Sequence, residues 1–572
     1  MLGASLAPGS LAAQPAMRVG TARVTSESDS LAVLRRARRA QSAFEVTRRG
    51  RLPVATGSPS GRCDVRVGRF CYWHDDGEPP PKPEPREIGR ARTKLLATLD
   101  SAAAQSPGDE WIAGQRVRYH LESADAHAAL AAARDCRSAP WWCAALAGFV
   151  LHQDSQPAAA DSAYRVALEQ MPDDERCRWT DISMLIGGKT ASAWKRAACG
   201  DAERSAVRDS IAEHFWWLSR PFFGRPTNDR YTEHLARRTM SRLESMATAG
   251  YDTRWGEDTE ELLLRFGWPT AWSRHLPAFG STASPSIVGH EPTPSFHFVP
   301  DERALDAAPE SLRPDAWQPT QRDAPERYAP SYLKGVAPLR AQVGLFRRGA
   351  EALVVARLEP PEDSLMRDSL VSVLAVSPGA SEPPVVVRRE GTGATLTALA
   401  PWRDALVSVE LLAPRAAARL RTGTRMRAPE GRLHLSDLLF YDAGELPVPA
   451  TLDAALPVLL GDARTPGDRR VGVLWETYGL APSGETVDVS LEVERVRVGW
   501  ATRAAERLRL ATAAPPIRVR WAESPDRRNG GAFRALALDL SQLAAGHYEV
   551  RLRLNAADGA MATAVRELEI VR

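Results

Sequence analysis

The sequence predicts a multidomain protein with an α-helical first half, followed by about 230 residues of antiparallel β-sandwich. Three observations predict this. The 572 residues exceed what one hydrophobic core can organise. Apolar residues recur at helical spacing up to about residue 250. Beyond residue 340, short runs alternate apolar and polar residues between turn residues.

The composition is that of an ordinary globular chain, with 44% hydrophobic residues, 25% charged residues and a net charge of +3. This near balance of charge gives no overall attraction to nucleic acid. Only five of the 74 basic residues are Lys, and this bias, with abundant Ala, indicates a GC-rich genome. Clusters such as RRARR at 35–39 are therefore interpreted as solvated helix faces. No run of 18 apolar residues occurs, so the sequence predicts no transmembrane helix.

The first 87 residues divide into two parts. Residues 1–17 are a candidate export-signal remnant, because LAAQ resembles a signal-peptidase site after Ala13, although a basic region and a solid apolar region are missing. A disordered N-terminus is the alternative. Residues 18–87 hold a predicted helix over 18–52, a Cys-containing segment and the Pro-rich linker DDGEPPPKPEP.

All the cysteines lie in the first 200 residues, and six cysteines allow 15 disulfide connectivities. Neighbour pairing is the simplest of these. It joins Cys63 to Cys71, Cys136 to Cys143 and Cys177 to Cys199. No Cys-x₂-Cys spacing or matching His indicates zinc. Disulfides predict an extracytoplasmic location, periplasmic, envelope-associated or secreted; buried free thiols are the alternative.

Residues 88–202 are predicted to be helical and contain an internal repeat of 34 residues. The repeat-packing positions are Gly114, Ala126, Leu130, Ala133, Gly148, Ala160, Tyr164 and Ala167. Small residues at these positions let two antiparallel helices approach closely, with a large apolar residue filling the gap. The period is that of the tetratricopeptide repeat, which this region resembles, and Pro172 closes the second unit. A generic pair of Ala-rich helices is the alternative.

Residues 203–275 hold an aromatic stretch, an amphipathic helix over about 228–250 and the sequence RWGEDTEELLLRFGWPTAW at 254–272. This last stretch resembles the motif of the GWxTD domain, a bacterial family named for Gly-Trp-x-Thr-Asp. The matching positions are Trp255, Asp258, Leu262–Leu264, Phe266, Gly267 and Pro269. The departures from the family pattern are Arg254, Glu257, Glu260 and Trp268. The resemblance in layout covers roughly residues 200–572 and implies an exported protein with no established activity.

The motif stretch is predicted to be a structural junction between helices and sandwiches rather than a catalytic loop. Leu262–Leu264 form an apolar run typical of a strand covered on both faces. Three tryptophans, including Trp255, supply apolar area for a domain interface. We expect Trp255 to be mostly buried and Asp258 to bond backbone or an arginine. A binding surface for a ligand or partner is the alternative.

Residues 276–340 are predicted to be a Pro-rich ordered linker. Two sandwiches follow, over 341–430 and 431–572. In the last predicted strand Tyr548, Val550 and Leu552 face one way, with charged residues between them. The preceding LAAGHY resembles the tyrosine corner of an immunoglobulin-like sandwich.

No motif specifies a catalytic, cofactor or metal site. IGGKT at 186–190 lacks the first glycine of a phosphate loop, because Ser183 stands there, and a helix-connecting turn is favoured. His290 and His297 flank a Pro-rich loop without a third ligand at metal spacing. Asp258 and Glu261 share a helix face, as solvated acids often do.

The function predicted is that of a non-enzymatic extracytoplasmic scaffold whose helical-repeat surface binds a protein partner. Two alternatives stay open. One is a hydrolase-type enzyme with its site at the helix–sandwich junction, near Asp258 and His290. The other is a purely structural component of the cell envelope.

Overall fold

The structure is a computed structural model of the chain. It describes residues 27–55, 63–73, 82–197, 199, 202–248, 251, 253–276, 286–291, 296–318, 324–362, 366, 370–391, 395–426, 432–444, 447–467, 470–481, 485–497, 516–524 and 531–571. The candidate signal-peptidase site after Ala13 lies outside these residues. No helix in these ranges is long and apolar enough to cross a membrane.

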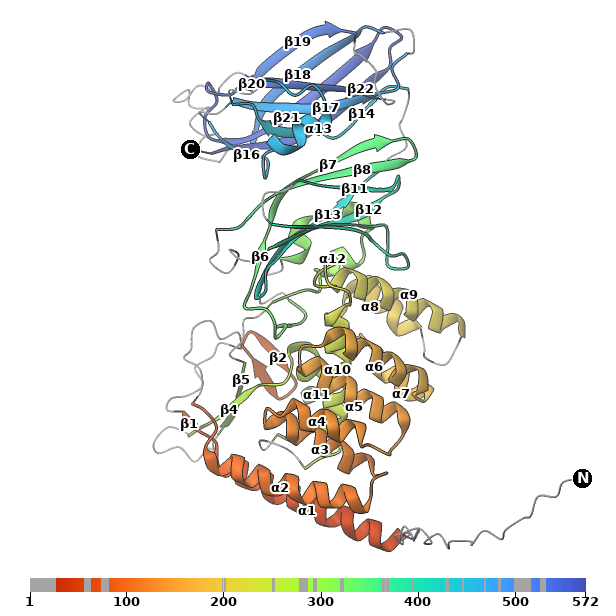
Figure 1. The fold of residues 1–572 in the computed structure, drawn as a ribbon, viewed down its shortest axis with the longest axis vertical. Coiled ribbons are helices and arrows are strands. Elements are labelled where there is room, and N and C mark those ends of the chain that lie inside the picture. Colours follow the sequence, from red (N-terminus) through yellow and green to blue (C-terminus); the bar gives the residue numbers. More distant parts are fainter. Residues whose placement is uncertain are drawn as a thin grey trace, which may run out of the picture.

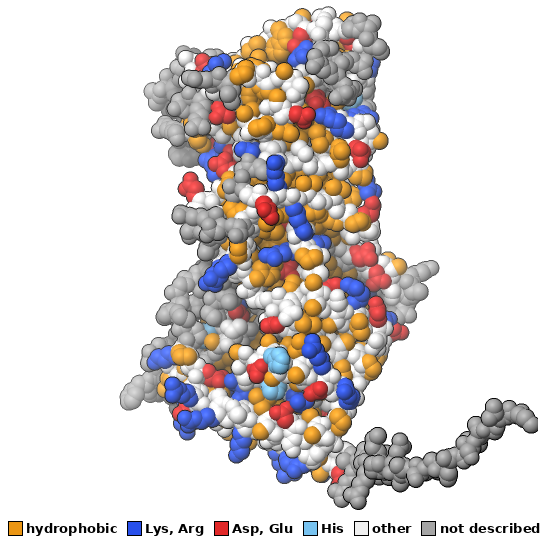
Figure 2. Space-filling view, viewed as in Figure 1, with side chains coloured by type: hydrophobic (Ala, Val, Ile, Leu, Met, Phe, Trp, Pro, Cys, Tyr) orange, Lys and Arg blue, Asp and Glu red, His pale blue; other side chains and the backbone are white. Residues whose placement is uncertain are grey.

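The molecule is elongated, with most of its helices and two small sheets in one half and the larger β-sheets in the other (Figure 1). The helices are α1 Glu27–Arg51, α2 Arg86–Gln105, α3 Glu110–Glu122, α4 Ala126–Arg134, α5 Pro140–Gln153, α6 Pro157–Gln170, α7 Asp173–Trp179, α8 Gly188–Arg196, α9 Ala202–Ser219, α10 Asp229–Ser245 and α11 Glu257–Phe266. Acidic and basic side chains are interspersed over the face seen in Figure 2, as the near-neutral composition predicts.

Helices α3 to α6 form two successive helix pairs, and α10 packs across them (Figure 1). Their shared core includes Trp142 and Leu146 of α5, Tyr164 of α6 and Leu243 of α10. Helices α1 and α2 add a further layer, centred on Phe44, which packs edge-on against Tyr119 of α3. The predicted 18–52 helix is therefore found as α1, from Glu27.

The two repeat glycines lie in helices and are buried, as predicted. A Cβ at Gly148 would stand 3.0 Å from the Tyr164 ring, which is the close crossing expected within the second helix pair. A Cβ at Gly114 would instead meet Leu243 of α10 at 2.6 Å and Trp142 at 3.1 Å. The first glycine thus makes room for α10 rather than for its own repeat partner, the half-buried Leu130.

Gly148→Leu is expected to destabilise the helical half by about 1–3 kcal/mol, because the new side chain must displace the Tyr164 ring. Urea unfolding followed by far-ultraviolet circular dichroism measures the loss. Gly89→Leu is the matched control, since a Cβ there meets nothing within 4 Å. Equal stability of both variants would show that the crossing tolerates bulk.

The three neighbouring cysteine pairs form the predicted disulfides. Their Cα–Cα distances are 5.4 Å for Cys63–Cys71, 5.6 Å for Cys136–Cys143 and 6.1 Å for Cys177–Cys199, all within the range that a bridge requires. Cys136 follows α4 and Cys143 lies in α5, so this bridge spans the turn between the two helices, as expected.

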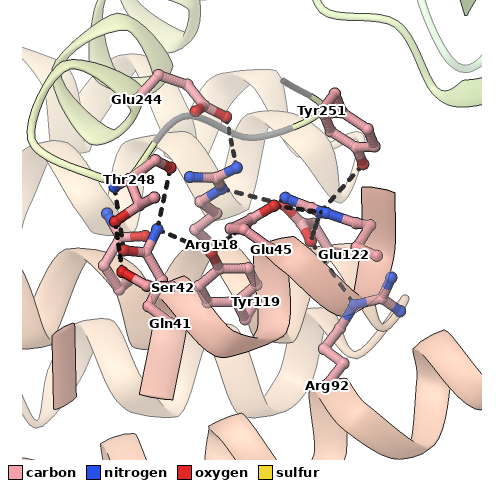
Figure 3. Close-up of polar contacts among 12 residues, drawn as sticks. Gln41, Ser42, Glu45, Arg92, Arg118, Tyr119, Glu122, Glu244, Thr248 and Tyr251 are labelled. Atoms are coloured by element: carbon pink, nitrogen blue, oxygen red, sulfur yellow. Dashed lines mark hydrogen bonds and ion pairs between the residues drawn. The ribbon is translucent and has the colours of Figure 1, made fainter. Parts of the chain in front are cut away.

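A buried network of charged residues joins α1 to α3 and to the end of α10 (Figure 3). Arg48 of α1 donates to Glu45 in its own helix and to Glu122 of α3, at 2.7 Å for the latter. Arg118 of α3 pairs with Glu122 at 3.0 Å and with Glu244 of α10 at 2.6 Å. These contacts fix the outer helix layer, although burying charges costs desolvation energy that only well-placed partners offset.

Burial raises the pKa of the Glu244 carboxyl to about 7, although the charge of Arg118 opposes the shift. The folded protein therefore holds this proton more tightly than the unfolded chain between pH 4.5 and 7. Stability should fall as the pH rises through that window. Glu45, Glu122 and Arg48 also face this carboxyl. The pKa of Glu122 is lowered, so its contribution is lost only below the window.

Glu244→Gln is accordingly expected to remove about 1–3 kcal/mol of the stability difference between pH 5 and pH 7.5. Guanidinium unfolding at both pH values measures it. The exposed Glu87→Gln variant should keep the wild-type pH slope. An unchanged slope in Glu244→Gln would contradict the assignment of this titration to Glu244.

Each sheet of the β-half is built from strands that all precede residue 430 in the sequence or all follow it. Before it come β6 Gly335–Pro338, β7 Arg340–Arg348, β8 Glu351–Glu359, β9 Val371–Ser377, β10 Val385–Glu390, β11 Thr395–Pro401, β12 Ala405–Leu412 and β13 Ala416–Thr424. They form sheets of order β10-β9-β12-β13-β6 and β11-β8-β7. The ladders are antiparallel except β6–β13. A core that includes Val354, Leu374 and Val409 joins the two sheets.

The second β-unit contains β14 His434–Leu435, β15 Leu439–Asp442, α13 Leu452–Ala455, β16 Arg464–Pro466, β17 Arg470–Tyr478, β18 Val487–Arg497, β19 Ile517–Glu523, β20 Gly531–Asp539, β21 Gly546–Ala556 and β22 Met561–Val571. One sheet has the order β14-β17-β15 with β20 also on β17, and the other β16-β22-β21-β18-β19. Tyr548, Val550 and Leu552 are buried, as their alternation predicts.

The predicted 276–340 linker is not a plain loop. Its described parts contain β5 Ser286–His290, α12 Glu302–Leu305, the short 3-10 helices Pro309–Ser311 and Pro314–Trp317, and β6. β5 pairs with β4 Ala271–His275, which also pairs with β1 Val54–Ala55. Many of these residues are buried, because the segment packs between the helices and the first β-unit.

Candidate functional site

The GWxTD-like stretch folds differently from the prediction. Leu262–Leu264 belong to helix α11, not to a strand. The helix begins where the Gly256 N–H donates to Thr259 Oγ1 at 2.8 Å. It ends at Gly267, whose φ of +89° suits glycine. Leu263 and Leu264 are buried on one face of the helix. This is the apolar stripe of an amphipathic helix and not a strand covered on both sides.

Asp258 bonds an arginine, as predicted. Its carboxylate accepts from Arg69 Nε at 2.6 Å and from Arg69 Nη2 at 2.8 Å, in a two-pronged pair that ties α11 to the hairpin of β2 Val65–Val67 and β3 Phe70–Tyr72. This hydrogen bond is the largest cause that holds the pKa of Asp258 low, at about 2. The neighbouring candidate Glu261 pairs with Arg265 in its own helix at 2.8 Å. Neither carboxylate stands free for catalysis.

The tryptophans of the stretch are partly exposed at the edge of the core, with most of each side chain buried, as expected for Trp255. Trp255 lies 6.3 Å from Trp268, and Trp268 lies 5.5 Å from Trp272, between ring centroids. Trp272 stacks on Tyr251 at 3.9 Å. This row of rings bridges the α3–α6 core and the α1–α2 layer, so its role is packing inside the helical half.

The junction with the β-half lies elsewhere, which corrects the prediction that the 254–272 stretch joins the helices to the sandwiches. It is made by the aromatic stretch at the end of α9. Phe215, Trp217 and Phe223 share a core with Ala375 and Leu406 of the first β-unit. The Glu410 carboxylate accepts from the backbone N–H groups of residues 223 and 224 at 2.8 and 2.9 Å. The joint is thus formed by Phe215 and Trp217 before Pro221 and by Phe222 and Phe223 after it, while α11 lies beside α10.

The remaining motif residues are engaged in structural contacts. At IGGKT, the backbone N–H of Thr190 donates to Asp306 at 3.1 Å, so an acid occupies the place where a phosphate would lie. His290 Nε2 lies 2.7 Å from Ser273 Oγ, and His297 Nδ1 lies 2.8 Å from the carbonyl of Glu326. Within the part of the chain that the structure describes, no three His, Cys, Asp or Glu side chains are grouped for a metal ion.

A small cavity of about 70 Å³ lies where α5 and α10 meet the segment 328–332. His152 near the end of α5, Asp229 at the start of α10 and Glu233 one turn later line it, together with Tyr328 and Tyr332. Ser155 and Ser331 stand exposed at its edge and bond each other at 2.5 Å. The cavity therefore opens to solvent at the boundary of the helical half.

Two hydrogen-bonded groups form the cavity wall. His152 Nε2 donates to Glu233 at 2.7 Å, and His152 Nδ1 lies 3.0 Å from Thr232 Oγ1. Burial would raise the pKa of Glu233, but Arg237 and His152 hold it well below its usual range. The Glu233 carboxylate is therefore ionised, and Arg237 and His152 balance its charge.

The second group is centred on Asp229, which is 2% exposed. Its Oδ2 accepts hydrogen bonds from the Tyr332 hydroxyl and, at 3.4 Å, from Tyr328. Its Oδ1 is buried and accepts no hydrogen bond from any described residue. Burial raises the pKa of Asp229, although the Tyr332 hydrogen bond opposes the shift. Perturbed acids in a cavity are candidates for binding or proton transfer.

Sequence reasoning missed this site. Its side chains come from residues 152, 229–233 and 328–332, and nothing in their spacing links them. Asp229 appears in the sequence only as a residue near a helix start. The one available signal is the pair of tyrosines in ERYAPSYLKG, which lies in a segment interpreted as linker.

No family model matches the chain, and no curated protein matches it. Solved structures with similar segments include a red sea bream transglutaminase, with 12% identity over 41% of this chain and 31% of that chain and a TM-score of 0.14. A tandem-repeat extending region of a large adhesion protein has 14% identity over 41% and 49%, with a TM-score of 0.14. A 1.5-MDa bacterial ice-binding adhesin has 10% identity over 41% and 65%, with a TM-score of 0.13. The chain spans less than two thirds of each of these chains, and likeness at these scores says nothing about fold or activity.

Proposed function

We propose that this protein is a non-enzymatic, extracytoplasmic scaffold that binds a protein partner through its helical region and uses its β-units as a rigid spacer. The proposal rests on the contacts that the acidic residues at these motifs make within the protein. Asp258 ties α11 to a distant hairpin, and Asp306 caps α8. These side chains hold segments together, as a scaffold requires, rather than converging on a reacting group.

Rigidity between the two halves supports the role of a spacer. Arg421 of β13 donates to the carbonyl of Leu218 at 3.0 Å, and Trp217 Nε1 donates to Ser377 at 2.7 Å. The two β-units are joined in turn by a core that includes Phe346 and Leu474. Contacts of this kind transmit position along the molecule instead of allowing hinge motion.

The proposal also covers the type of helical repeat, the type of sandwich and the family of the chain. In the second helix pair, the close approach of Gly148 to Tyr164 supports a tetratricopeptide-like repeat. In the first pair, Gly114 makes room for α10 instead. The Tyr548 hydroxyl donates to the carbonyl of Ala544 at 2.7 Å, a tyrosine-corner contact that supports an immunoglobulin-like sandwich. The stretch at 254–272 supports membership of the GWxTD type, with its motif used for packing.

Three disulfides and the finding that no described helix could cross a membrane are consistent with an extracytoplasmic protein. Alkylation of free thiols in intact cells, before and after reduction, tests the compartment. We expect no labelling before reduction. Six labelled thiols without reduction would place the chain in a reducing compartment and overturn this part of the proposal.

Site-specific photocrosslinking in the native cell tests partner binding. A crosslinker at Val166, which is 43% exposed on α6, should capture one discrete protein. A crosslinker at Leu399, which is 50% exposed on β11, is the matched control and should not capture it. The same product from both positions, or none from any exposed position of α4 and α6, would overturn the proposed use of the helical surface.

The cavity favours a second candidate, a hydrolase-type enzyme at the helix–sandwich boundary, because His152, Asp229 and Glu233 line one space. The place differs from the one predicted near Asp258 and His290. Both nitrogens of His152 lie within hydrogen-bond distance of protein oxygens, so both already have partners within the protein. Substrate turnover lost in Asp229→Asn would favour the enzyme. A purely structural envelope component is favoured if neither turnover nor crosslinking is found.

A further inference from the structure

A second cavity lies where the helical half meets the first β-unit. Its volume is about 190 Å³, and residues of β6, β13 and the 296–318 segment line it. Much of its lining is apolar and includes Trp317 and Val336, and none of the described lining residues is acidic. Gln318 on one side and Pro338 on the other are exposed, so the cavity is open to solvent between them.

Two arginines from one face of β13 supply positive charge to this cavity. Arg419 and Arg421 are two residues apart in the strand, so both side chains point to the same face of the sheet. Arg421 donates through Nη1 to the Leu218 carbonyl at 3.0 Å and through Nη2 to the Pro221 carbonyl at 3.1 Å. Its Nε donates to Ser408 Oγ at 3.4 Å. Arg421 therefore contributes charge rather than an available donor.

Arg419 keeps two donors available. Its Nη1 donates to the Pro221 carbonyl at 2.7 Å, and its guanidinium lies over the Phe298 ring at 5.1 Å, which together hold the group in place. None of the described residues accepts a hydrogen bond from Nε or Nη2, the two N–H groups on one edge of the guanidinium. Arg419 is 9% exposed, and these two nitrogens are not among the enclosed polar atoms that lack a hydrogen bond. An anion in the cavity can therefore reach this edge.

Two acids act on Arg419 from outside the cavity, but both have other partners. Burial lowers the pKa of Arg419 to about 10, although the charges of Glu410 and Glu326 oppose the shift. Glu410 accepts from two backbone N–H groups, and Glu326 pairs with Arg230. Burial and the like charge of Arg419 also lower the pKa of Arg421. Arg419 is thus a cation at neutral pH whose open edge has no acid among the described residues as a hydrogen-bond partner.

The donor pattern and the apolar wall select the kind of anion. Two parallel N–H groups match the two oxygens of a carboxylate. A phosphate or sulfate has further oxygens, which would lie against Trp317 and Val336 without donors. A ring or branched side chain attached to a carboxylate would instead bury apolar area there. The volume of about 190 Å³ is many times what one water needs, so a group of this size fits.

We propose that the cavity between β6, β13 and residues 296–318 binds a carboxylate that carries an apolar group, with both carboxylate oxygens accepting from the Nε and Nη2 edge of Arg419. Two sources share this chemistry: the C-terminal carboxylate of a peptide that ends in an apolar residue, and a free apolar acid. The site goes beyond the proposed scaffold function, because it lies where the two halves meet and not on the surface of α6.

Calorimetry on the full chain with four probes tests the ligand. Phenylacetate represents a free apolar acid, and an acetylated alanyl-phenylalanine dipeptide with a free carboxylate represents a peptide end. Phenylacetamide is the neutral control, and inorganic phosphate tests the class of anion. We expect millimolar binding of both carboxylates, at least about tenfold weaker binding of phosphate and none of phenylacetamide. Tighter binding of the dipeptide would assign a peptide terminus, and equal or tighter binding of phenylacetate would assign a free acid.

Four variants locate the site. Arg419→Gln removes the charge and the pair of donors, so carboxylate affinity should fall at least about tenfold. Arg419→Lys keeps the charge without two parallel donors and should lose affinity by a smaller factor. Gln318→Trp should block the mouth without changing Arg419, which keeps the test decisive if Arg419→Gln folds poorly. Arg403→Gln is the matched control, because Arg403 is 45% exposed in the same β-unit, and it should leave the affinity unchanged.

Carboxylate binding that survives both Arg419→Gln and Gln318→Trp would overturn the site. So would equal binding of phenylacetamide, phosphate binding as tight as that of phenylacetate, or no carboxylate binding at tens of millimolar. These failures are distinguishable from failure of the scaffold proposal. Crosslinking from α6 without carboxylate binding would retain the scaffold and reject the site, and carboxylate binding without crosslinking would do the reverse.

Discussion

Glu326→Ala is expected to destabilise the protein by about 3–5 kcal/mol, because it leaves Arg230 as an uncompensated buried charge. Both side chains are fully buried, and Arg230 Nε donates to Glu326 Oε2 at 2.8 Å. The other oxygen of Glu326 accepts from the backbone N–H groups of Phe298 at 3.1 Å and Val299 at 3.4 Å. One carboxylate therefore holds α10 and two segments of the 296–328 region together.

Guanidinium unfolding followed by tryptophan fluorescence measures the loss, since several tryptophans lie near this joint. Glu326→Gln should be less severe, because its amide oxygen can still accept the two backbone hydrogen bonds. Glu382→Ala is the matched control: its partner Arg403 is 45% exposed, and little change is expected. Equal unfolding midpoints for Glu326→Ala and Glu382→Ala would show that the buried pair contributes no more than an exposed one.

Much of the fold was predictable because its signals are local. The 34-residue spacing placed Gly114 and Gly148 in helices, and alternation placed Tyr548 and Leu552 on a buried face. The disulfides followed from neighbour pairing. The role of Gly114 against α10 was not predictable, because a repeat spacing says nothing about a helix more than 100 residues away.

The error over Leu262–Leu264 has a local cause as well. Three consecutive leucines fit a buried strand and a helix equally well by hydrophobicity. The flanking residues decide the question: Glu257 and Glu260 lie in the first turn and Arg265 in the last, where they complement the helix dipole. Gly267 then ends the helix. Glu257 and Glu260, two of the departures from the family pattern, are therefore signals for the start of a helix.

The candidate site was less predictable than the fold. Asp229, His152 and Tyr332 meet only because α10 crosses α5 and the 328–332 segment returns onto both. The burial of Asp229 and the lack of a donor to its Oδ1 are tertiary properties. The aromatic joint at 215–223 was visible as an aromatic stretch, but its partner Leu406 lies nearly 200 residues away.

Trp142→Ala is expected to destabilise the helical half by about 3–5 kcal/mol, because it removes a fully buried indole from the centre of the α3–α6 core. The ring packs at 5.8 Å from Trp141 and lies beneath the Arg242 guanidinium at 5.2 Å. Its Nε1 donates to the carbonyl of Glu110 at 3.2 Å, so truncation also leaves that acceptor without this donor.

Trp255→Ala is the informative comparison, since Trp255 belongs to the GWxTD-like stretch and packs against the same core while partly exposed. A partly exposed ring loses less transfer free energy and leaves a site that solvent can fill, so the loss should be clearly smaller than for Trp142→Ala. Thermal unfolding at 222 nm compares the two variants. Crosslinking from Val166 is measured in parallel.

If Trp255→Ala kept the wild-type melting temperature and abolished the crosslink, the stretch would be a recognition surface rather than packing. If it matched the loss of Trp142→Ala, the partly exposed position would be as central to the core as a fully buried one.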